Sequence, residues 1–290
     1  MANPTEWFPA HILQGRAGAE GCLGAETDAG CHHHHHPDQE DQTRLAIIIL
    51  NQPLHDEETL KVLWKNASLR VAADGGANRL LDICHKIGDD IFKDLDVIIG
   101  DLDSLTPEAR NYFTTTPAKP AHIIHDPDQY STDFTKAVRY IRSCSTHGNK
   151  PIDIIAMGGL GGRVDQGLSQ LHHLYLFQKD SHYADGRMYL VSGESLTVLL
   201  KAGCHRIHVR SAAGPEGPQQ KQQDVFDKYV GIIPVKEPSV ISTKGLEWDV
   251  TDWETEFGGL MSTSNHVLPE TRIVEVETSK DVLFTIALKR

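Results

Sequence analysis

Residues 95–104 read LDVIIGDLDS, an apolar run that ends directly in a glycine and two aspartates. Three other β-branched or apolar runs, at 69–73, 121–124 and 152–156, also lead into a polar or glycine-rich motif. Together with runs at 45–50 and 187–191, they alternate with amphipathic segments, and this alternation predicts a parallel α/β sheet. Open parallel sheets bind ligands at the carboxyl edge of their strands, so we expect these motifs to converge there.

The pattern changes near residue 192, where the apolar period falls to two. Strand-like runs follow at 195–200, 205–210, 229–235, 272–277 and 281–288. The predicted fold is therefore a Rossmann-like parallel α/β domain at 44–191 followed by an all-β domain, a β-sandwich, at 192–290. Residues 212–224 are rich in Gly, Pro and Gln and are predicted to form a mobile loop without a catalytic role.

Residues 1–43 show neither helical nor strand periodicity, which predicts a disordered N-terminal extension. It contains the run His32–His36. A flexible homopolymer fixes no coordination geometry, so we assign this run no function.

Two later segments carry apolar residues at helical spacing, and both are predicted to be helices packed on the sheet. The first stripe is Phe134, Ala137, Val138 and Ile141. The second stripe is Val164, Leu168, Leu171 and Tyr175.

The composition argues against several partners. The chain has 290 residues, with 28 Lys and Arg against 40 Asp and Glu, a net charge of -12, and no basic stripe, which disfavours nucleic acid. Its apolar stretches are too short to span a bilayer, so no membrane partner is expected. The cysteine number is odd and no Cys-x-x-Cys pair occurs, which fits a reducing compartment, and we expect a cytoplasmic protein.

Aspartates dominate the strand-end motifs: Asp74, Asp101, Asp103, Asp133 and Asp165. Such a group would repel a triphosphate by about 4 kcal/mol per charge pair at 4 Å and an effective dielectric of 20, so a cation must intervene. Carboxylate oxygens without nearby His or Cys select Mg²⁺, which takes only one or two protein carboxylates in nucleotide sites. The remaining aspartates would orient water, accept a proton or hold Arg163.

The segment Gly158–Gly162 and Arg163 suit an anion, because glycine backbone N–H groups approach phosphate closely and guanidinium presents a planar fork. Simpler interpretations remain open. Asp133 and Asp165 each fall in the first turn of a predicted helix and are also explained by the helix dipole. Lys136 is either a surface partner of Asp133 or a phosphate contact.

In order along the chain, four motifs resemble those of the thiamin pyrophosphokinase family: DGGANRL (74–80), GDLDS (100–104), DQYSTDFTKA (128–137) and GGRVDQ (161–166). In the second half, Leu246-Glu247-Trp248 and residues 260–265 also resemble the family's thiamin-side motifs. The resemblance covers about 44–290.

The resemblance implies an ATP-dependent transfer. The hydroxyethyl oxygen of thiamin attacks the β-phosphorus of MgATP, AMP is released and thiamin diphosphate forms. It further implies a homodimer with the active site at the subunit interface.

By the same resemblance, Asp101 and Asp103 would lead the metal site, and Asp74, Asp133 and Asp165 would complete a catalytic acidic site. The phosphate-binding residues would be Gln129, Thr132, Gly161, Gly162 and Arg163. Trp248, Ser262 and Asn265 would contribute to the thiamin pocket, although core packing for Trp248 and a turn at 262–265 are the structural alternatives.

Two other functions compete with this one. A metal-dependent nucleotide phosphohydrolase would use the same aspartates on water, and a non-catalytic nucleotide sensor would bind MgATP without turnover. A dinucleotide oxidoreductase is disfavoured because residues 159–164 lack the last glycine of the usual fingerprint.

Overall fold

The computed structural model describes residues 3–14, 44–146, 152–179, 186–210 and 224–290. The run His32–His36 lies outside these residues, as does the predicted loop 212–224 except for Asp224.

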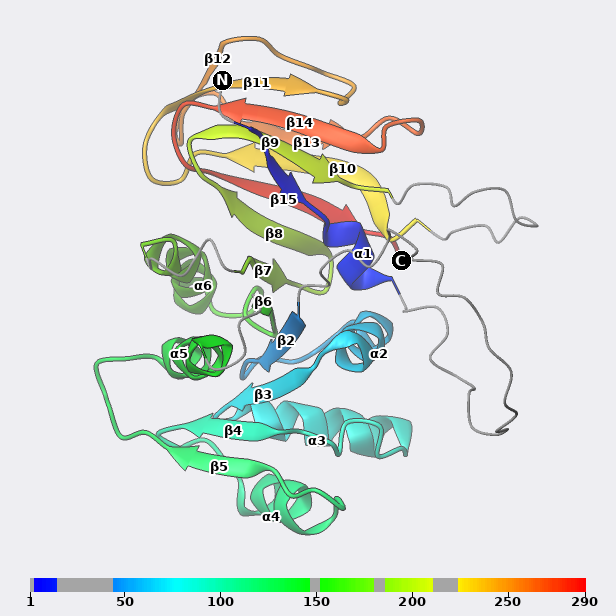
Figure 1. Ribbon diagram of the computed structural model, residues 1–290, viewed down its shortest axis with the longest axis vertical. Helices are drawn as coiled ribbons and strands as arrows, with labels where there is room; N and C mark the ends of the chain where they lie inside the picture. Colours follow the sequence, from blue (N-terminus) through cyan, green and yellow to red (C-terminus); the bar gives the residue numbers. More distant parts are fainter. Residues whose placement is uncertain (1–2, 15–43, 147–151, 180–185, 211–223) are drawn as a thin grey trace, which may run out of the picture.

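A ten-stranded sheet crosses the molecule in the order β13-β10-β15-β8-β7-β6-β2-β3-β4-β5 (Figure 1). Its parallel strands are β2 (Arg44–Ile49), β3 (Leu69–Ala73), β4 (Val97–Gly100), β5 (His122–His125), β6 (Ile152–Met157) and β7 (Met188–Val191). Strand β2 lies between β3 and β6, so the chain order reverses beside it. Such a switch point opens a crevice at the carboxyl ends of the two strands on either side.

Helices cover both faces of the parallel strands (Figure 1). They are α2 (Glu57–Asn66), α3 (Gly76–Ile87), α4 (Pro107–Thr115), α5 (Asp133–Thr146) and α6 (Val164–Phe177). Side chains of β2 alternate between the two cores: Leu45, Ile47 and Ile49 pack with α2 and α3, whereas Ala46 and Ile48 pack with α5 and α6. Burial on both faces explains why the strands are continuously apolar.

The second half is β-rich, which confirms the predicted fold class of a parallel α/β part followed by a β part. Its strands are β8 (Ser195–Leu200), β9 (Gly203–His208), β10 (Phe226–Ile233), β11 (Ser239–Lys244), β12 (Trp253–Thr255), β13 (Ser262–His266), β14 (Ile273–Thr278) and β15 (Val282–Leu288). Strand β8 pairs antiparallel with β7, so the ten-stranded sheet continues across residue 192. A second sheet, β1-β9-β14-β11-β12, shares a hydrophobic core with β8, β10 and β15.

The expectation of disorder before Arg44 is wrong for the first described residues. Strand β1 (Thr5–Trp7) pairs in parallel with β9, and helix α1 (Pro9–Leu13) follows it. Trp7 is 2% exposed and its Nε1 donates to Nδ1 of His205 at 3.1 Å. A three-residue strand is too short to show a period, and its partner lies about two hundred residues away in the sequence.

The apolar stripe predicted for α5 is buried, but the stripe predicted for α6 is only half correct: Leu171 and Tyr175 pack against the core, whereas its first two members do not. Val164 is 77% exposed and Leu168 is 57% exposed. The buried residues of α6 are Gln170, His173, Leu174 and Phe177. Two of these four are polar, so the hydrophobic periodicity gives a face that is offset from the buried one.

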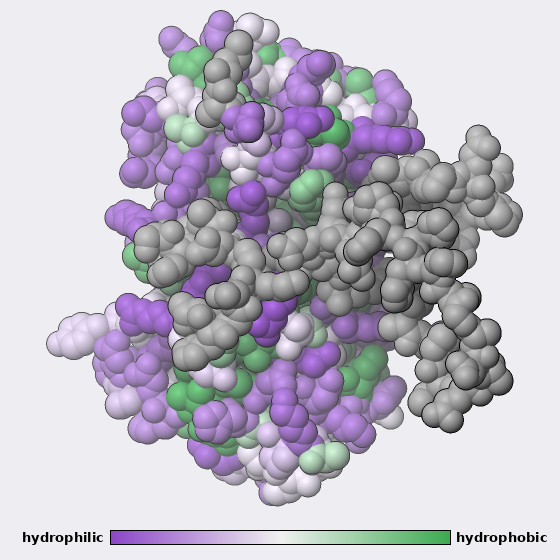
Figure 2. Space-filling model, in the orientation of Figure 1, coloured by the Kyte–Doolittle hydropathy of each residue, from purple (hydrophilic) through white to green (hydrophobic). Residues whose placement is uncertain are grey.

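No helix among the described residues is long and apolar enough to cross a membrane. Figure 2 shows a face that is mostly hydrophilic, with hydrophobic residues in small separate groups rather than one broad patch.

Candidate active site

A cavity of about 290 Å³ opens at the switch point beside β2. Asn51 and Gln52 follow β2, and Gly158 and Gly159 follow β6. The cavity is further lined by Ala73, Asp101, Gln129, Ser131, Thr132, Asp133, Gln166, Ser169 and Gln170, among others. The predicted convergence of the strand-end motifs is therefore present in the fold.

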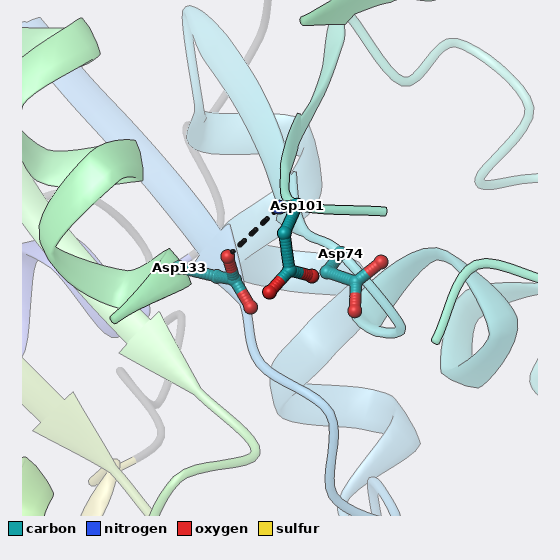
Figure 3. A group of neighbouring side chains, drawn as sticks. All are labelled: Asp74, Asp101 and Asp133. Atoms are coloured by element: carbon teal, nitrogen blue, oxygen red, sulfur yellow. Dashed lines mark hydrogen bonds between the residues drawn. The ribbon is translucent and has the colours of Figure 1, made fainter. Parts of the chain in front are cut away.

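Three aspartates form a compact cluster beside this cavity (Figure 3). Asp74 follows β3, Asp101 follows β4 and Asp133 begins α5. One carboxylate oxygen from each lies within 4.8 Å of those of the other two. Three elements far apart in the sequence thus direct negative charge to one point.

Local backbone geometry allows this close approach. A Cβ atom at Gly100 would lie 2.8 Å from Cβ of Asp74 and 2.9 Å from Oδ1 of Asp133, so only glycine leaves room for both. Asp74 itself has φ 45°, a left-handed conformation that non-glycine residues adopt at a cost. The motif residues are therefore required by the shape of the site as well as by its charge.

Hydrogen bonds orient two of the carboxylates. Asp74 is 4% exposed, and its Oδ2 accepts from the backbone N–H of Ser104 at 3.0 Å. Its Oδ1 is buried and has no hydrogen-bond partner among the described residues. Asp101 accepts from the Asp103 backbone N–H at 3.2 Å and from Gln129 Nε2 at 3.3 Å.

Asp133 is held by its own helix and by the neighbouring motif. Its Oδ1 accepts from the Asp101 backbone N–H at 3.2 Å and from Lys136 Nζ at 3.1 Å. Burial raises the pKa of Asp133 above its ordinary value and the Asp101 carboxylate adds to this, whereas the Lys136 ammonium opposes it. Lys136 is 2% exposed, so it is a buried partner of Asp133 rather than a surface one.

The cluster fits a hard divalent cation. It offers carboxylate oxygens without sulfur or imidazole ligands, which is the donor set that Mg²⁺ prefers. A buried carboxylate oxygen without a partner, as at Asp74 Oδ1, is costly unless a cation or a donor meets it.

Two of the predicted aspartates lie outside the cluster. Asp103 is exposed and contacts the cluster through its backbone N–H, which donates to Asp101. Asp165 is also exposed, and Arg163 donates hydrogen bonds to both of its carboxylate oxygens, from Nε to Oδ1 at 3.1 Å and from Nη2 to Oδ2 at 2.5 Å. The hydrogen bond from Arg163 lowers the pKa of Asp165 despite some opposing desolvation.

Of the predicted phosphate-binding residues, two line the cavity and the other three, Gly161, Gly162 and Arg163, do not. Gln129 and Thr132 line the cavity. Gly161 and Gly162 are exposed in the loop before α6, with φ 121° and 70°, values that favour glycine. Arg163 ends that loop and is the residue that precedes the helix.

The predicted thiamin residues do not line this cavity. Asn265 is buried, and its side chain forms hydrogen bonds with both backbone groups of Trp248. Its Oδ1 accepts from the Trp248 N–H at 3.2 Å, and its Nδ2 donates to the Trp248 carbonyl at 2.9 Å. The Trp248 ring is 55% exposed and packs on His266 at 4.9 Å between ring centroids. Ser262 begins β13. Trp248 is therefore presented on the surface, against the alternative of a core tryptophan.

Sequence reasoning missed two polar residues near the site, Gln170 and His173. Both lie on the buried face of α6. Because their side chains are polar, the sequence predicts that they face solvent. Their spacing from Leu174 and Phe177, which places all four on one face of the helix, is the signal that could have identified them.

Comparisons with known proteins agree with this geometry. Residues 60–184 match a family model described as "Thiamin pyrophosphokinase, catalytic domain", and residues 204–283 match one described as "Thiamin pyrophosphokinase, vitamin B1 binding domain". The chain is 37% identical to thiamine pyrophosphokinase 2 of Arabidopsis thaliana over 259 residues, covering 86% of this chain and 88% of the relative. It is 28% identical to thiamine pyrophosphokinase of Saccharomyces cerevisiae over 295 residues, covering 87% of each.

Solved structures show the same fold. A crystal structure of yeast thiamin pyrophosphokinase superposes with a TM-score of 0.73 at 23% identity, covering 99% of this chain and 92% of that one. Thiamin pyrophosphokinase from Candida albicans gives a TM-score of 0.72 at 22% identity, covering 100% of this chain and 95% of that one.

Proposed function

This chain belongs to the thiamin pyrophosphokinase family, whose enzymes transfer pyrophosphate from ATP to thiamin. We propose that Asp74, Asp101 and Asp133 bind the Mg²⁺ that this reaction uses. The products are thiamin diphosphate and AMP. The comparisons support neither the phosphohydrolase nor the nucleotide sensor.

The observation that carries the metal assignment is the convergence of three carboxylate oxygens within 4.8 Å around a buried, unpartnered Asp74 oxygen. Mg²⁺ bound there would neutralise charge on the phosphates of ATP and help to align them. This assignment revises the metal pair predicted from sequence, because Asp74 and Asp133 replace Asp103 beside Asp101.

The remaining residues are proposed to bind and orient. Backbone N–H groups of Gly161 and Gly162, together with the Arg163 guanidinium, would contact phosphate oxygens. Asp165 accepts from Arg163 with both oxygens, so it would hold that fork in place rather than take a proton.

Thiamin is proposed to bind between two copies of the chain. Among the described residues, those that line the cavity all belong to the α/β half, whereas Trp248 is exposed on the β-rich half. A second copy that brings its Trp248, Ser262 and Asn265 to this cavity would complete the site. Apolar side chains exposed on both sides, Val164 and Leu168 on α6 and Phe257 and Leu260 on the β half, support such a contact.

The decisive experiment follows AMP and thiamin diphosphate in reactions that contain the protein, ATP and Mg²⁺, with and without thiamin. We expect both products only when thiamin is present, and loss of both when EDTA removes the metal. AMP release that is independent of thiamin would instead indicate a phosphohydrolase. Binding of ATP without product would indicate a sensor.

A further inference from the structure

His173 lies on the buried face of α6 and is 2% exposed. Its ring packs against Phe134 of α5 at 4.8 Å and against Phe177 at 5.6 Å between ring centroids. One imidazole therefore sits at the junction of α6 with the first turn of α5, the turn that carries Asp133 and Lys136.

The hydrogen bonds of His173 fix its tautomer. Nδ1 lies 2.5 Å from the backbone carbonyl of Ser169, and a carbonyl only accepts, so Nδ1 carries the proton. Burial lowers the pKa of His173, which favours the neutral ring, and Nε2 is therefore an acceptor. It faces the hydroxyl groups of Thr132 at 2.9 Å and Thr135 at 3.0 Å, which also lie 3.0 Å from each other, so one hydroxyl donates to Nε2 and the other donates to its neighbour.

These two threonines build the start of α5. Thr132 Oγ1 accepts from the backbone N–H of Thr135 at 3.1 Å, and the Thr132 carbonyl accepts from the N–H of Lys136 at 3.0 Å. Thr132 is thus the N-cap of the helix whose first residue is Asp133. The family resemblance implies a phosphate contact for Thr132, and in the structure its hydroxyl also caps α5 and lies within hydrogen-bond distance of the imidazole.

We propose that His173 is a positioning residue for pyrophosphoryl transfer, because it fixes the Thr132–Thr135 turn and through it the carboxylate of Asp133. The inference rests on the proposed role of Asp133 in the metal cluster. Asp133 Oδ1 is also tied to the Asp101 backbone and to Lys136, so a shift of this turn changes the cluster at two of its three members. The same imidazole links that turn to α6, which begins beside Arg163 and Asp165.

The test uses the full-length protein with His173→Phe, which keeps a ring in the aromatic pocket but removes both nitrogens. We expect kcat to fall about tenfold to a hundredfold, as for small misplacements of catalytic groups. The KM for thiamin should change little, because the proposed thiamin contacts Trp248, Ser262 and Asn265 lie on the β-rich half, away from this turn. Binding of Mn²⁺ alone, followed by the electron paramagnetic resonance signal of the free ion, should weaken.

A conservative variant and a neighbour provide controls. His173→Gln places an amide acceptor near the Nε2 position and should restore most of kcat and of Mn²⁺ affinity. His172 is the adjacent residue on the exposed face of α6, and His172→Phe should behave as wild type. Circular dichroism melts establish that the variants are folded.

Wild-type kcat and Mn²⁺ affinity in folded His173→Phe would overturn the proposal, as would an equal loss in the Phe and Gln variants. If His173→Phe does not fold, Thr135→Val removes one of the two hydroxyl donors at nearly constant shape, and wild-type values there would also overturn it. If the wild-type protein shows no thiamin-dependent AMP release, the proposed function fails. The Mn²⁺ titration still tests whether His173 positions the metal cluster in that case, because metal binding requires no turnover.

Discussion

Leu102, between the two aspartates of the Gly-Asp-Leu-Asp-Ser motif, has φ 65° and turns the chain sharply after β4. Because of this turn, Asp101 joins the cluster while Asp103 is exposed and reaches it only through a backbone N–H. Sequence spacing cannot distinguish the two residues, since both follow the same strand. Their different positions lead to a direct test.

We predict that Asp74→Asn lowers kcat by at least about a hundredfold, as expected when a group that stabilises transition-state charge is removed. It should also weaken Mn²⁺ binding. Asp103→Asn serves as the matched comparison and should retain most Mn²⁺ affinity, because its carboxylate lies outside the cluster. Isothermal titration with Mn²⁺ and steady-state kinetics measure both effects. Equal losses of metal affinity in the two variants would restore the pair Asp101 and Asp103 as the metal site.

Arg163 is exposed, with a side chain 72% accessible, and its ion pair with Asp165 contributes little to stability in water. We therefore expect its function to lie in phosphate binding. Arg163→Ala should reduce kcat roughly 10² to 10³-fold with little change in melting temperature. Arg110→Ala on α4, also exposed, is the control. A loss smaller than tenfold would limit Arg163 to structural support.

At this scale the sequence predicted the site better than it predicted individual roles. All three cluster members were among the five candidate aspartates, because each follows or begins an element with a recognisable pattern. Lys136 was found but its burial was not, and His173 was missed. Their positions depend on helix phase and on which side chains pack beneath the helix, and neither is encoded in a local motif.

At the scale of elements, β1 and α1 illustrate what local patterns cannot predict. Glu6 of β1 accepts from Arg206 Nη1 at 2.9 Å and pairs with His208, two residues of β9. Arg187 lies over the Trp7 ring, with its guanidinium carbon 4.6 Å from the ring centroid. The segment is ordered by residues far away in the sequence, so composition alone suggested disorder.

The contact between Trp7 and His205 predicts a pH-dependent stability. His205 Nδ1 accepts from Trp7, and its Nε2 lies 2.7 Å from the Lys201 carbonyl, so the ring is neutral in the fold. Burial lowers the pKa of His205 below the ordinary value of 6.5, and the nearby Arg187 guanidinium adds to this, although the Lys201 carbonyl opposes it. The unfolded chain therefore binds a proton first.

Stability from His205 should be complete above about pH 6.5 and should decline as the pH falls from there through the folded pKa. We expect the free energy of unfolding in urea to decrease from pH 8 to pH 5.5 in the wild type, and the decrease to be smaller in His205→Gln. His122→Gln, at an exposed position of β5, should leave it unchanged. An identical pH dependence in wild type and His205→Gln would contradict the assignment.

At the scale of the whole molecule, the acidic cavity and the exposed Trp248 lie on different halves of one chain. Phe257 and Leu260, each 64% exposed, follow β12 in the loop that leads to β13, the strand that positions Trp248 through Asn265. The α6 residues Val164 and Leu168 are exposed beside the glycine-rich loop 158–162. Two such surfaces on every chain allow a symmetric pair that forms two identical sites.

We predict that the wild-type protein sediments as the proposed dimer and that the double variant Phe257→Asp with Leu260→Asp sediments as a monomer. Thiamin-dependent turnover of this variant should fall by at least about tenfold, because apolar interface anchors are lost. Binding of Mn²⁺ should persist, since the cluster belongs to one chain. Sedimentation velocity and the AMP assay measure the two effects. Ile91→Asp, at an exposed apolar residue outside both surfaces, is the control. A variant that remains dimeric and active would place the interface elsewhere.

The edge position of β1 has a practical consequence for anyone who shortens this protein. The matched family segments begin at residue 60, and the sequence pattern suggests Arg44 as a natural start. A version trimmed to residue 60 would lose β2 from the interior of the ten-stranded sheet and should not fold. A version trimmed to Arg44 would leave β9 as an unpaired sheet edge, with backbone groups free to pair with a strand from a neighbouring molecule. It would also expose the apolar side chains that Trp7 covers in the core, so such a truncated version should aggregate more readily at high concentration than the full chain.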